Sequence, residues 1–98
     1  MEKVNKPTVR ALAEGEKFKT KQMKASSGKL LPKHLANVES VVVVTKGEIM
    51  FNLEGENHPL KQGDVFVVPR DAQHQIKVVE DFAAIHIMPQ DIKFEYFN

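Results

Sequence analysis

Apolar residues recur along this chain in short stretches, separated by glycine, proline or acidic residues. Residues 47–55, GEIMFNLEG, place Ile49, Phe51 and Leu53 on one side and Met50 and Asn52 on the other, as expected of a strand with two distinct faces. Residues 38–45, VESVVVVT, are apolar on both faces, which predicts a fully buried strand. Further predicted strands are DVFVVP at 64–69, HQIKVVE at 74–80, DFAAIHIMP at 81–89 and the tail DIKFEYFN at 91–98. This pattern predicts an all-β sandwich or small barrel.

The segments between and beside these stretches predict turns, an additional strand and one short helix. EGEN at 54–57 offers Gly and Asn for positive φ, so we expect a hairpin there. We interpret Glu80 and Asp81 as the turn between two strands, and we expect the tail to add a strand to its own sheet or to a partner's. Only PTVRALAE at 7–14 has a helical pattern, about two turns long.

Length and composition predict one soluble domain over residues 1–98. Of the 98 residues, 42% are hydrophobic and 28% charged, which is ordinary for a globular chain. The absence of cysteine excludes thiolate chemistry, disulfides and cysteine-based zinc sites. MEKVNKPTVR lacks the apolar core of a signal peptide, and the aliphatic run Val41–Val44 is too short to span a bilayer. We therefore expect a cytoplasmic protein with no membrane partner.

The net charge of +1 hides an uneven distribution. Residues 1–33 hold nine Lys or Arg against three Glu, a balance of +6, so the remainder carries −5. The lysines of KFKTKQMKA alternate with other residues and do not cluster with aromatic ones. We interpret them as the solvated face of a strand or a lysine-protected sheet edge, not as a nucleic-acid site.

Two stretches have a distinctive spacing of glycine, histidine and proline. The first runs Gly28, five residues, His34, one residue, Ala36, three residues, Ser40, six residues and Gly47. It is similar in spacing to the first motif of the cupin superfamily, in which Gly is followed by His-x-His, then Glu, then Gly.

The second stretch continues the likeness. It runs Gly63, five residues, Pro69, one residue, Asp71, two residues, His74, three residues and Val78. The second cupin motif has Gly, Pro-x-Gly, His and Asn at this spacing. The chain therefore resembles a small single-domain cupin, which implies a double-stranded β-helix, or jelly-roll barrel, with a motif-bearing core at 28–88. An N-terminal strand or short helix at 1–27 and a C-terminal strand at 89–98 would flank it. Asp71 replaces a turn glycine and is one of the residues that tolerate the left-handed region.

The resemblance also implies a metal site of three histidines and one glutamate, and this chain departs from it. Of the four ligand positions, His34 and His74 keep their imidazoles, whereas Ala36 has no donor atom and Ser40 offers only a hydroxyl. Two histidines leave at least two coordination positions open, while catalytic zinc sites ordinarily have three protein ligands. We expect a pocket marked by His34 and His74, with a divalent metal (Zn, Fe, Mn or Ni) bound weakly or not at all.

Three other residues bear on this pocket. Glu39 lies one position from the expected glutamate and needs a β-bulge to point inward. His86 shares a strand face with Ala84 and Met88, so it either reaches the pocket as a third imidazole or lies on the outer or interface side. We interpret His58 as a solvent-exposed hairpin-loop residue.

The valine run predicts a covered outer surface. Val42 and Val44 face one way and Val41 and Val43 the other, so both faces of this strand need covering. Together with the apolar tail, this favours a homodimer.

Three functions follow from these patterns. The leading hypothesis is a small-molecule-binding barrel whose ligand pocket contains His34, Ala36, Ser40, His74 and His86. The first alternative is a metal-dependent enzyme of the dioxygenase or isomerase type, using His34, His74 and a substituted third ligand such as His86. The second is a non-catalytic structural or regulatory dimer. No catalytic residue is identified, and acid–base catalysis lacks recognisable orienting groups because the single tyrosine, Tyr96, lies in the tail.

Overall fold

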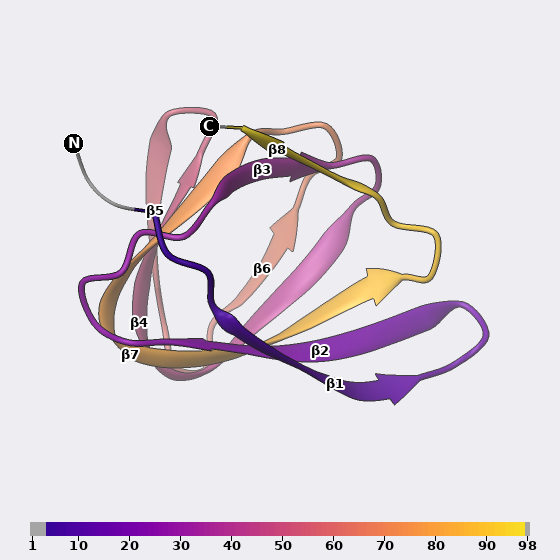
Figure 1. Cartoon of the computed structure of the whole chain (residues 1–98), viewed down its shortest axis with the longest axis horizontal. Helices are drawn as coiled ribbons and strands as arrows, with labels where there is room; N and C mark the ends of the chain where they lie inside the picture. The colour runs from indigo at the N-terminus through magenta and orange to yellow at the C-terminus, as the bar shows by residue number, and fades with distance from the viewer. Residues whose placement is uncertain (1–3, 98) are drawn as a thin grey trace.

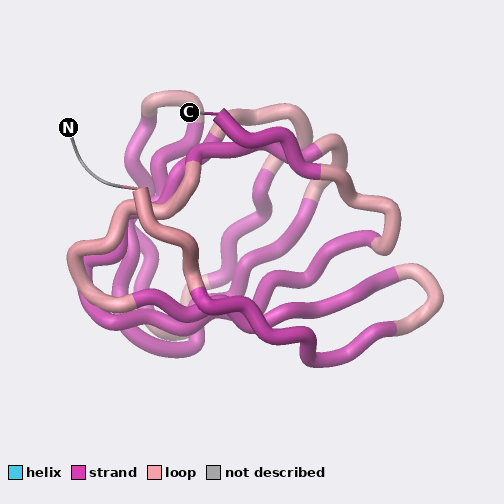
Figure 2. The backbone as a smooth tube through the Cα atoms, in the orientation of Figure 1, coloured by secondary structure: helices cyan, strands magenta, loops and turns pink. Residues whose placement is uncertain are grey.

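The structure is a computed structural model that describes residues 4–97. Its described residues form eight β-strands and no helix, so the predicted all-β class is confirmed (Figure 2). The strands are β1 Thr8–Glu14, β2 Phe18–Ala25, β3 Lys33–Ala36, β4 Ser40–Leu53, β5 Glu56–Lys61, β6 Val65–Val68, β7 His74–Pro89 and β8 Phe94–Phe97. None of the described segments is a helix long and apolar enough to cross a membrane.

Strands β4 and β7 organise the sheet. They pair antiparallel over almost their full lengths, from Val41 opposite Ile87 to Leu53 opposite His74. Strand β2 adds to β7 and β1 to β2, while β5 and β6 pair with β4. Strand β3 pairs with the start of β7 and with β8. The sheet curls so that β3 and β8 lie on the opposite side of the molecule from β1 and β2, as Figure 1 shows, which is the expected jelly-roll arrangement.

Two long strands replace the four shorter ones that the sequence predicted. Residues 74–89 form one continuous strand, so the prediction of a turn at Glu80 and Asp81 is wrong. The ladder of β4 and β7 bends here, and its register shifts between Val44 and Ile49. Gly47 makes the bend possible with a φ of 77°, and a Cβ at this position would lie 2.0 Å from the backbone oxygen of Asp81. A bulge and a glycine thus turn the strands without ending them.

The predicted N-terminal helix is wrong. Residues 8–14 form strand β1, which pairs with β2 from Thr8 opposite Lys24 to Glu14 opposite Lys19. Helix propensities of Ala, Leu and Glu differ from those of other residues by only tenths of a kcal/mol, and the backbone hydrogen bonds to β2 outweigh them. Because β1 covers it, the lysine-rich strand β2 is not a sheet edge.

Several turn predictions can be compared with the backbone. The hairpin at 54–57 is confirmed, although Glu54 (φ 49°) and Gly55 (φ 85°) adopt the positive φ values, not Asn57. Asp71 has a φ of 57°, as its place in a glycine position predicted. His58 lies in strand β5, not in a loop, and is half-buried with its ring 5.3 Å from that of Phe66.

The core lies inside the curled sheet. Val42 and Val44 are 2% and 1% exposed and face inward, whereas Val41 and Val43 are half-buried on the outer face. Phe51, 1% exposed, packs with Ile49, Val78 and other aliphatic side chains. The tail strand β8 pairs with β3 of the same chain, so the expectation that it extends its own sheet is confirmed.

Candidate functional site

His34 and His74, forty positions apart in sequence, meet inside the curled sheet. His34 on β3 and His74 at the start of β7 are directly opposed register partners. Their Nε2 atoms lie 3.1 Å apart and their ring centroids 4.3 Å apart. His74 is 5% exposed and stacks on Phe51 with a centroid distance of 5.2 Å, so one side of the pair rests on the core.

Backbone carbonyls fix the tautomer of both rings. The Nδ1 of His34 lies 3.0 Å from the backbone oxygen of Pro32, and the Nδ1 of His74 lies 2.9 Å from that of Ala72. A carbonyl oxygen only accepts hydrogen bonds, so each Nδ1 carries the proton. In the neutral rings, each Nε2 is then an unprotonated acceptor that faces the other.

The environment disfavours placing a proton between the two rings. Burial is the main cause that lowers the pKa of His74 to about 4; the hydrogen bond to Ala72 opposes this shift and the charge of His34 adds to it. Burial also lowers the pKa of His34, against the hydrogen bond to Pro32. Near pH 7 both imidazoles are therefore neutral, with two lone pairs directed at the same small volume.

His86 faces inward and joins this region. Its Nε2 lies 2.8 Å from the Oγ of Ser40, which is 3% exposed. The alternative that placed His86 on the outer or interface side is therefore wrong. Burial, and then the charges of His34, His74 and Lys21, lower the pKa of His86 to about 4.

The other two motif positions differ in their surroundings. Ser40, at the start of β4, is the hydrogen-bond partner of His86. Ala36 is 2% exposed and packs with Met88 and Ile92, so it contributes an apolar wall. Glu39 is exposed and precedes β4, and the bulge that would turn it inward is not formed there.

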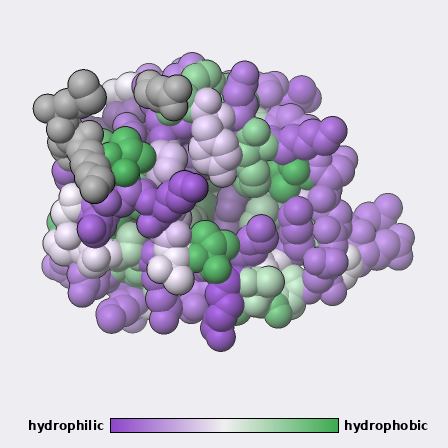
Figure 3. Space-filling view, in the orientation of Figure 1, coloured by the Kyte–Doolittle hydropathy of each residue, from purple (hydrophilic) through white to green (hydrophobic). Residues whose placement is uncertain are grey.

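Two aromatic residues of the tail, which the sequence did not indicate, lie at this site. The ring of Tyr96 is 5.1 Å from that of His34, and the ring of Phe94 is 5.6 Å from His34 and 6.3 Å from His86. Tyr96 is 63% exposed and Phe94 37%, so they form the rim where the site meets solvent. In the orientation of Figure 1, the molecular surface is recessed between the β3–β8 rim and β2 (Figure 3).

The donor set fits part of a metal site. Metal-bound histidines commonly donate the second ring N–H to a backbone carbonyl, as both rings do here. Two nitrogens 3.1 Å apart also match two adjacent ligands at about 2.0–2.1 Å from one ion. Yet within residues 4–97 no group of three or more His, Asp or Glu side chains is arranged to hold a metal. The pair thus fits two coordination positions, not a full protein site.

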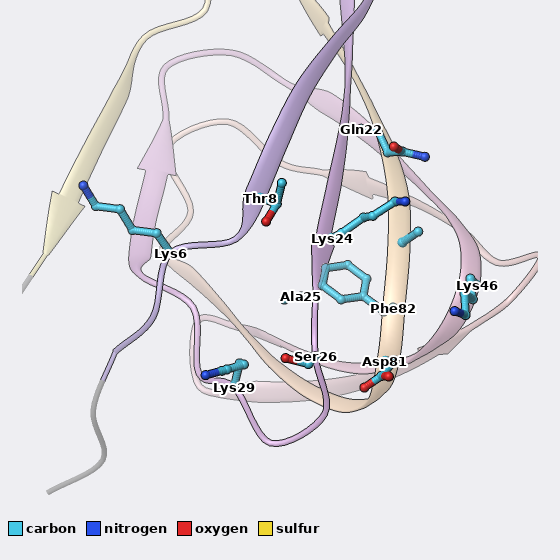
Figure 4. Close-up of a pocket in the computed structure, with 11 residues that line it drawn as sticks. Lys6, Thr8, Gln22, Lys24, Ala25, Ser26, Lys29, Lys46, Asp81 and Phe82 are labelled. Carbon is cyan, nitrogen blue, oxygen red and sulfur yellow. The ribbon is translucent and has the colours of Figure 1, made fainter.

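A separate hollow of about 530 Å³ lies along β2, the bend of β7 and the segment before β1. Four lysines surround it (Lys6, Lys24, Lys29 and Lys46), as Figure 4 shows. Phe82 and Ala83 also line it, and both are nearly fully buried. None of the three inward-facing histidines borders this hollow, so it is not part of the candidate site.

The sequence and the fold were compared with known proteins. The sequence pattern of the cupin domain matches residues 23–88. A double-stranded β-helix protein from Klebsiella pneumoniae superposes with a TM-score of 0.84 at 17% identity, over 100% of this chain and 90% of that chain. KdgF from Halomonas sp. superposes with a TM-score of 0.76 at 24% identity, over 83% of this chain and 76% of that chain.

A larger protein contains the same fold. Salicylate 1,2-dioxygenase from Pseudoaminobacter salicylatoxidans, solved as a mutant in complex with gentisate, superposes with a TM-score of 0.82 at 14% identity. The match covers 92% of this chain but 29% of the dioxygenase, so this chain spans less than a third of that protein. These likenesses show the fold alone. No curated protein sequence matches the chain significantly.

Proposed function

Since this chain belongs to the cupin family, we propose that it binds a small molecule at the mouth of its barrel, with His34 and His74 holding a weakly bound divalent cation. The distance of 3.1 Å between the two Nε2 atoms carries this proposal. Two lone pairs that face each other this closely repel unless a cation lies between them. Because burial lowers the pKa of both rings, protons do not compete with a metal ion for the two nitrogens near pH 7.

The affinity for metal should be modest. His34 and His74 supply two ligands, and the remaining positions fall to water or to the bound molecule. Zn²⁺, Fe²⁺, Mn²⁺ or Ni²⁺ all accept imidazole nitrogen. When bound, the ion would act as a Lewis acid toward an oxygen of that molecule.

The surrounding residues shape the space for the small molecule. His86 and Ser40 form a hydrogen-bonded pair that offers polar atoms at the inner side. Phe94 and Tyr96 provide an aromatic rim beside His34. Ala36 leaves room where the family pattern has a histidine, and its small side chain contributes to an apolar wall.

The metal-dependent dioxygenase or isomerase alternative needs a third protein ligand. His86 is the candidate, but its Nε2 is engaged with Ser40. A binding function is therefore the better supported of the two.

Zinc binding to the metal-free protein tests this proposal. Wild-type protein, purified without an affinity tag and freed of metal with EDTA, is titrated with Zn²⁺ by calorimetry. We expect about one Zn²⁺ per chain, and loss of this binding in His34→Ala and in His74→Ala. His58→Ala, on the outlying strand β5, is the matched control and should bind Zn²⁺ as the wild type does. Absence of binding, or equal binding in all four proteins, would overturn the proposal.

The outer sheet face supports a homodimer. Val41 lies opposite Ile87 and Val67, and Val43 lies opposite Ile85 and Val65, so six β-branched side chains form one apolar grid over β7, β4 and β6. Val65 and Val67 are 61% and 51% exposed. We infer that a second copy of this chain covers the grid, because two identical uncharged faces related by a two-fold axis would remove each other's exposed apolar side chains from water.

A further inference from the structure

Lys21 projects from β2 onto the inner face of the sheet, at the histidine site. It is the register partner of His86 on β7, and directly opposed residues of an antiparallel pair share a face. His86 faces inward, since its Nε2 reaches the buried Ser40. The side chain of Lys21 is half-buried accordingly, whereas Lys24, on the other face of β2, is exposed.

No carboxylate neutralises Lys21 in this position. Its cross-strand neighbours are Ala11 on one side and His86 on the other. By contrast, Lys19, two positions earlier on the same face, lies opposite Glu14. Within the described part of the chain, Lys21 takes part in no ion pair. Lys21 therefore presents an ammonium group without a carboxylate partner beside the histidines, and an anionic ligand could supply that partner.

The other residues of the histidine site add no negative charge. They are His34, His74, His86, Ser40, Phe94 and Tyr96, and Glu39 points to solvent. The charge of Lys21 reaches the site, because it contributes to the lowered pKa of His86. The mouth of the barrel is therefore electropositive and lined on one side by aromatic rings.

We propose that Lys21 selects the ligand of this site and that the ligand is a small aromatic carboxylate. The ammonium of Lys21 would bind the carboxylate, and the planar ring would lie against Phe94 and Tyr96. A phosphate group fits less well, because phosphate sites usually draw on arginine forks, glycine-rich loops or helix N-termini, and none of these lies here. This inference rests on the proposed function, since it takes the histidine site to be the binding site.

Benzoate, benzamide and inorganic phosphate serve as probes. Benzamide keeps the shape of benzoate without its charge, and phosphate keeps a charge without the ring. Each is titrated into metal-free and Zn²⁺-loaded full-length protein, and binding is followed by NMR through the ring protons of His34, His74 and His86. Lys21→Met removes the charge and keeps the length of the side chain. Lys24→Met is the matched control on the opposite face of the same strand.

We expect only the Lys21→Met variant to lose affinity for benzoate. Benzoate should bind the wild type and the Lys24→Met variant alike, and about tenfold or more weakly to Lys21→Met, the effect of losing one charge-assisted hydrogen bond. Benzamide should bind about tenfold more weakly than benzoate to the wild type and equally to both variants, and phosphate should leave the ring protons unshifted.

Other outcomes separate this inference from the proposed function. Equal benzoate binding by Lys21→Met and Lys24→Met, tighter binding of phosphate than of benzoate, or no benzoate binding at all would overturn the role of Lys21. In each of these cases, the zinc titration would still test the proposed metal binding independently. Conversely, Lys21-dependent benzoate binding by a protein that binds no Zn²⁺ would support this inference and refute the metal part of the proposed function.

Discussion

The Nε2 atoms of His34 and His74 face each other at 3.1 Å, while each ring is tied through Nδ1 to the carbonyl oxygen two residues before it. This relationship determines what the pair can do. The backbone orients both rings before any ligand arrives, so a cation would bind without reorganising them. It also makes a direct spectroscopic prediction.

Both histidines should be in the Nδ1–H tautomer in the metal-free protein near pH 7. Nitrogen-15 NMR of the imidazole rings distinguishes a protonated from an unprotonated ring nitrogen. Zn²⁺ should shift the Nε2 resonances of His34 and His74 and leave those of His58 in place. An Nε2–H tautomer in either member of the pair would contradict the hydrogen bonds to Pro32 and Ala72.

The free energy of unfolding of the metal-free protein should fall as the pH decreases from about 6.5 to about 4. The pKa values of His74 and His86 are about 4 in the folded protein against 6.5 for an unperturbed histidine. Between these values the unfolded chain binds more protons, so stability increases with pH over this range. Urea unfolding at several pH values measures the effect.

His86→Gln isolates the contribution of one ring. Glutamine does not titrate and retains a hydrogen-bonding group for Ser40. The dependence of stability on pH should therefore be shallower in this variant than in the wild type, and His58→Gln, which replaces a histidine outside the site, is the matched control. Contributions from groups that all three proteins share cancel in the comparison. Identical slopes in the wild type and in His86→Gln would show that His86 is not buried as described.

Ser40→Glu should strengthen metal binding. The family pattern has a glutamate at this position, and Ser40 faces the interior beside His86. A carboxylate there would add a third protein ligand, so we expect Zn²⁺ to bind at least about tenfold more tightly than to the wild type. Ser40→Gln, which has the same size without the charge, should show no such gain. Calorimetric titration compares the three proteins, and equal gains in both variants would argue against ligation.

Gly47→Ala should destabilise the fold strongly. The added Cβ would meet the backbone oxygen of Asp81 at 2.0 Å, in addition to the cost of a positive φ. We expect a loss of more than about 3 kcal/mol or failure to fold, because backbone must move to make room. Gly55→Ala is the matched control, since Gly55 also has a positive φ (85°) but has open space around it. It should lose about 1–2 kcal/mol by urea unfolding.

Val65→Glu and Val67→Glu should disrupt a homodimer. Both side chains are more than half exposed in the isolated chain, so the substitutions should leave the protomer folded. Light scattering after size-exclusion chromatography should show wild-type dimers and variant monomers. Val79→Glu, 43% exposed at the bend of β7 and outside the apolar grid, should remain dimeric. A monomeric wild-type protein would refute the proposed interface.

Much of the fold could be predicted from the order of apolar, polar and turn-forming residues along the chain. β-Branched and aromatic stretches with punctuating Gly and Pro predicted an all-β barrel, and the resemblance to the two cupin motifs implied that His34 and His74 would meet. The strand-face assignment of the valines was also sound: Val42 and Val44 are buried, and Val41 and Val43 lie on the outer face. The strand faces depend on side-chain alternation, which the sequence displays directly.

Other features depend on partners that are far away in the chain. Because residues two positions apart share a strand face, the sequence placed His86 on the same face as Ala84 and Met88. Only the pairing of β7 with β2 and β4 decided that this face points inward. Lys21 lies two positions from Met23 and therefore on the same strand face, and Met23 packs against the core. This was the one signal in the sequence for an inward-facing lysine. Nothing local indicated that β8 would bring Phe94 and Tyr96 to His34.

The sequence by itself therefore determined the fold class and the residue sets that share each strand face, and its resemblance to the cupin motifs implied the meeting of the two histidines. Only the tertiary structure decided which face points inward, that β1 is a strand, that β4 and β7 continue through their bends, and which distant side chains surround the histidine pair. The physical reason is that alternation is a property of a single strand. Register and curvature, in contrast, arise from hydrogen bonds between strands that are distant in the chain.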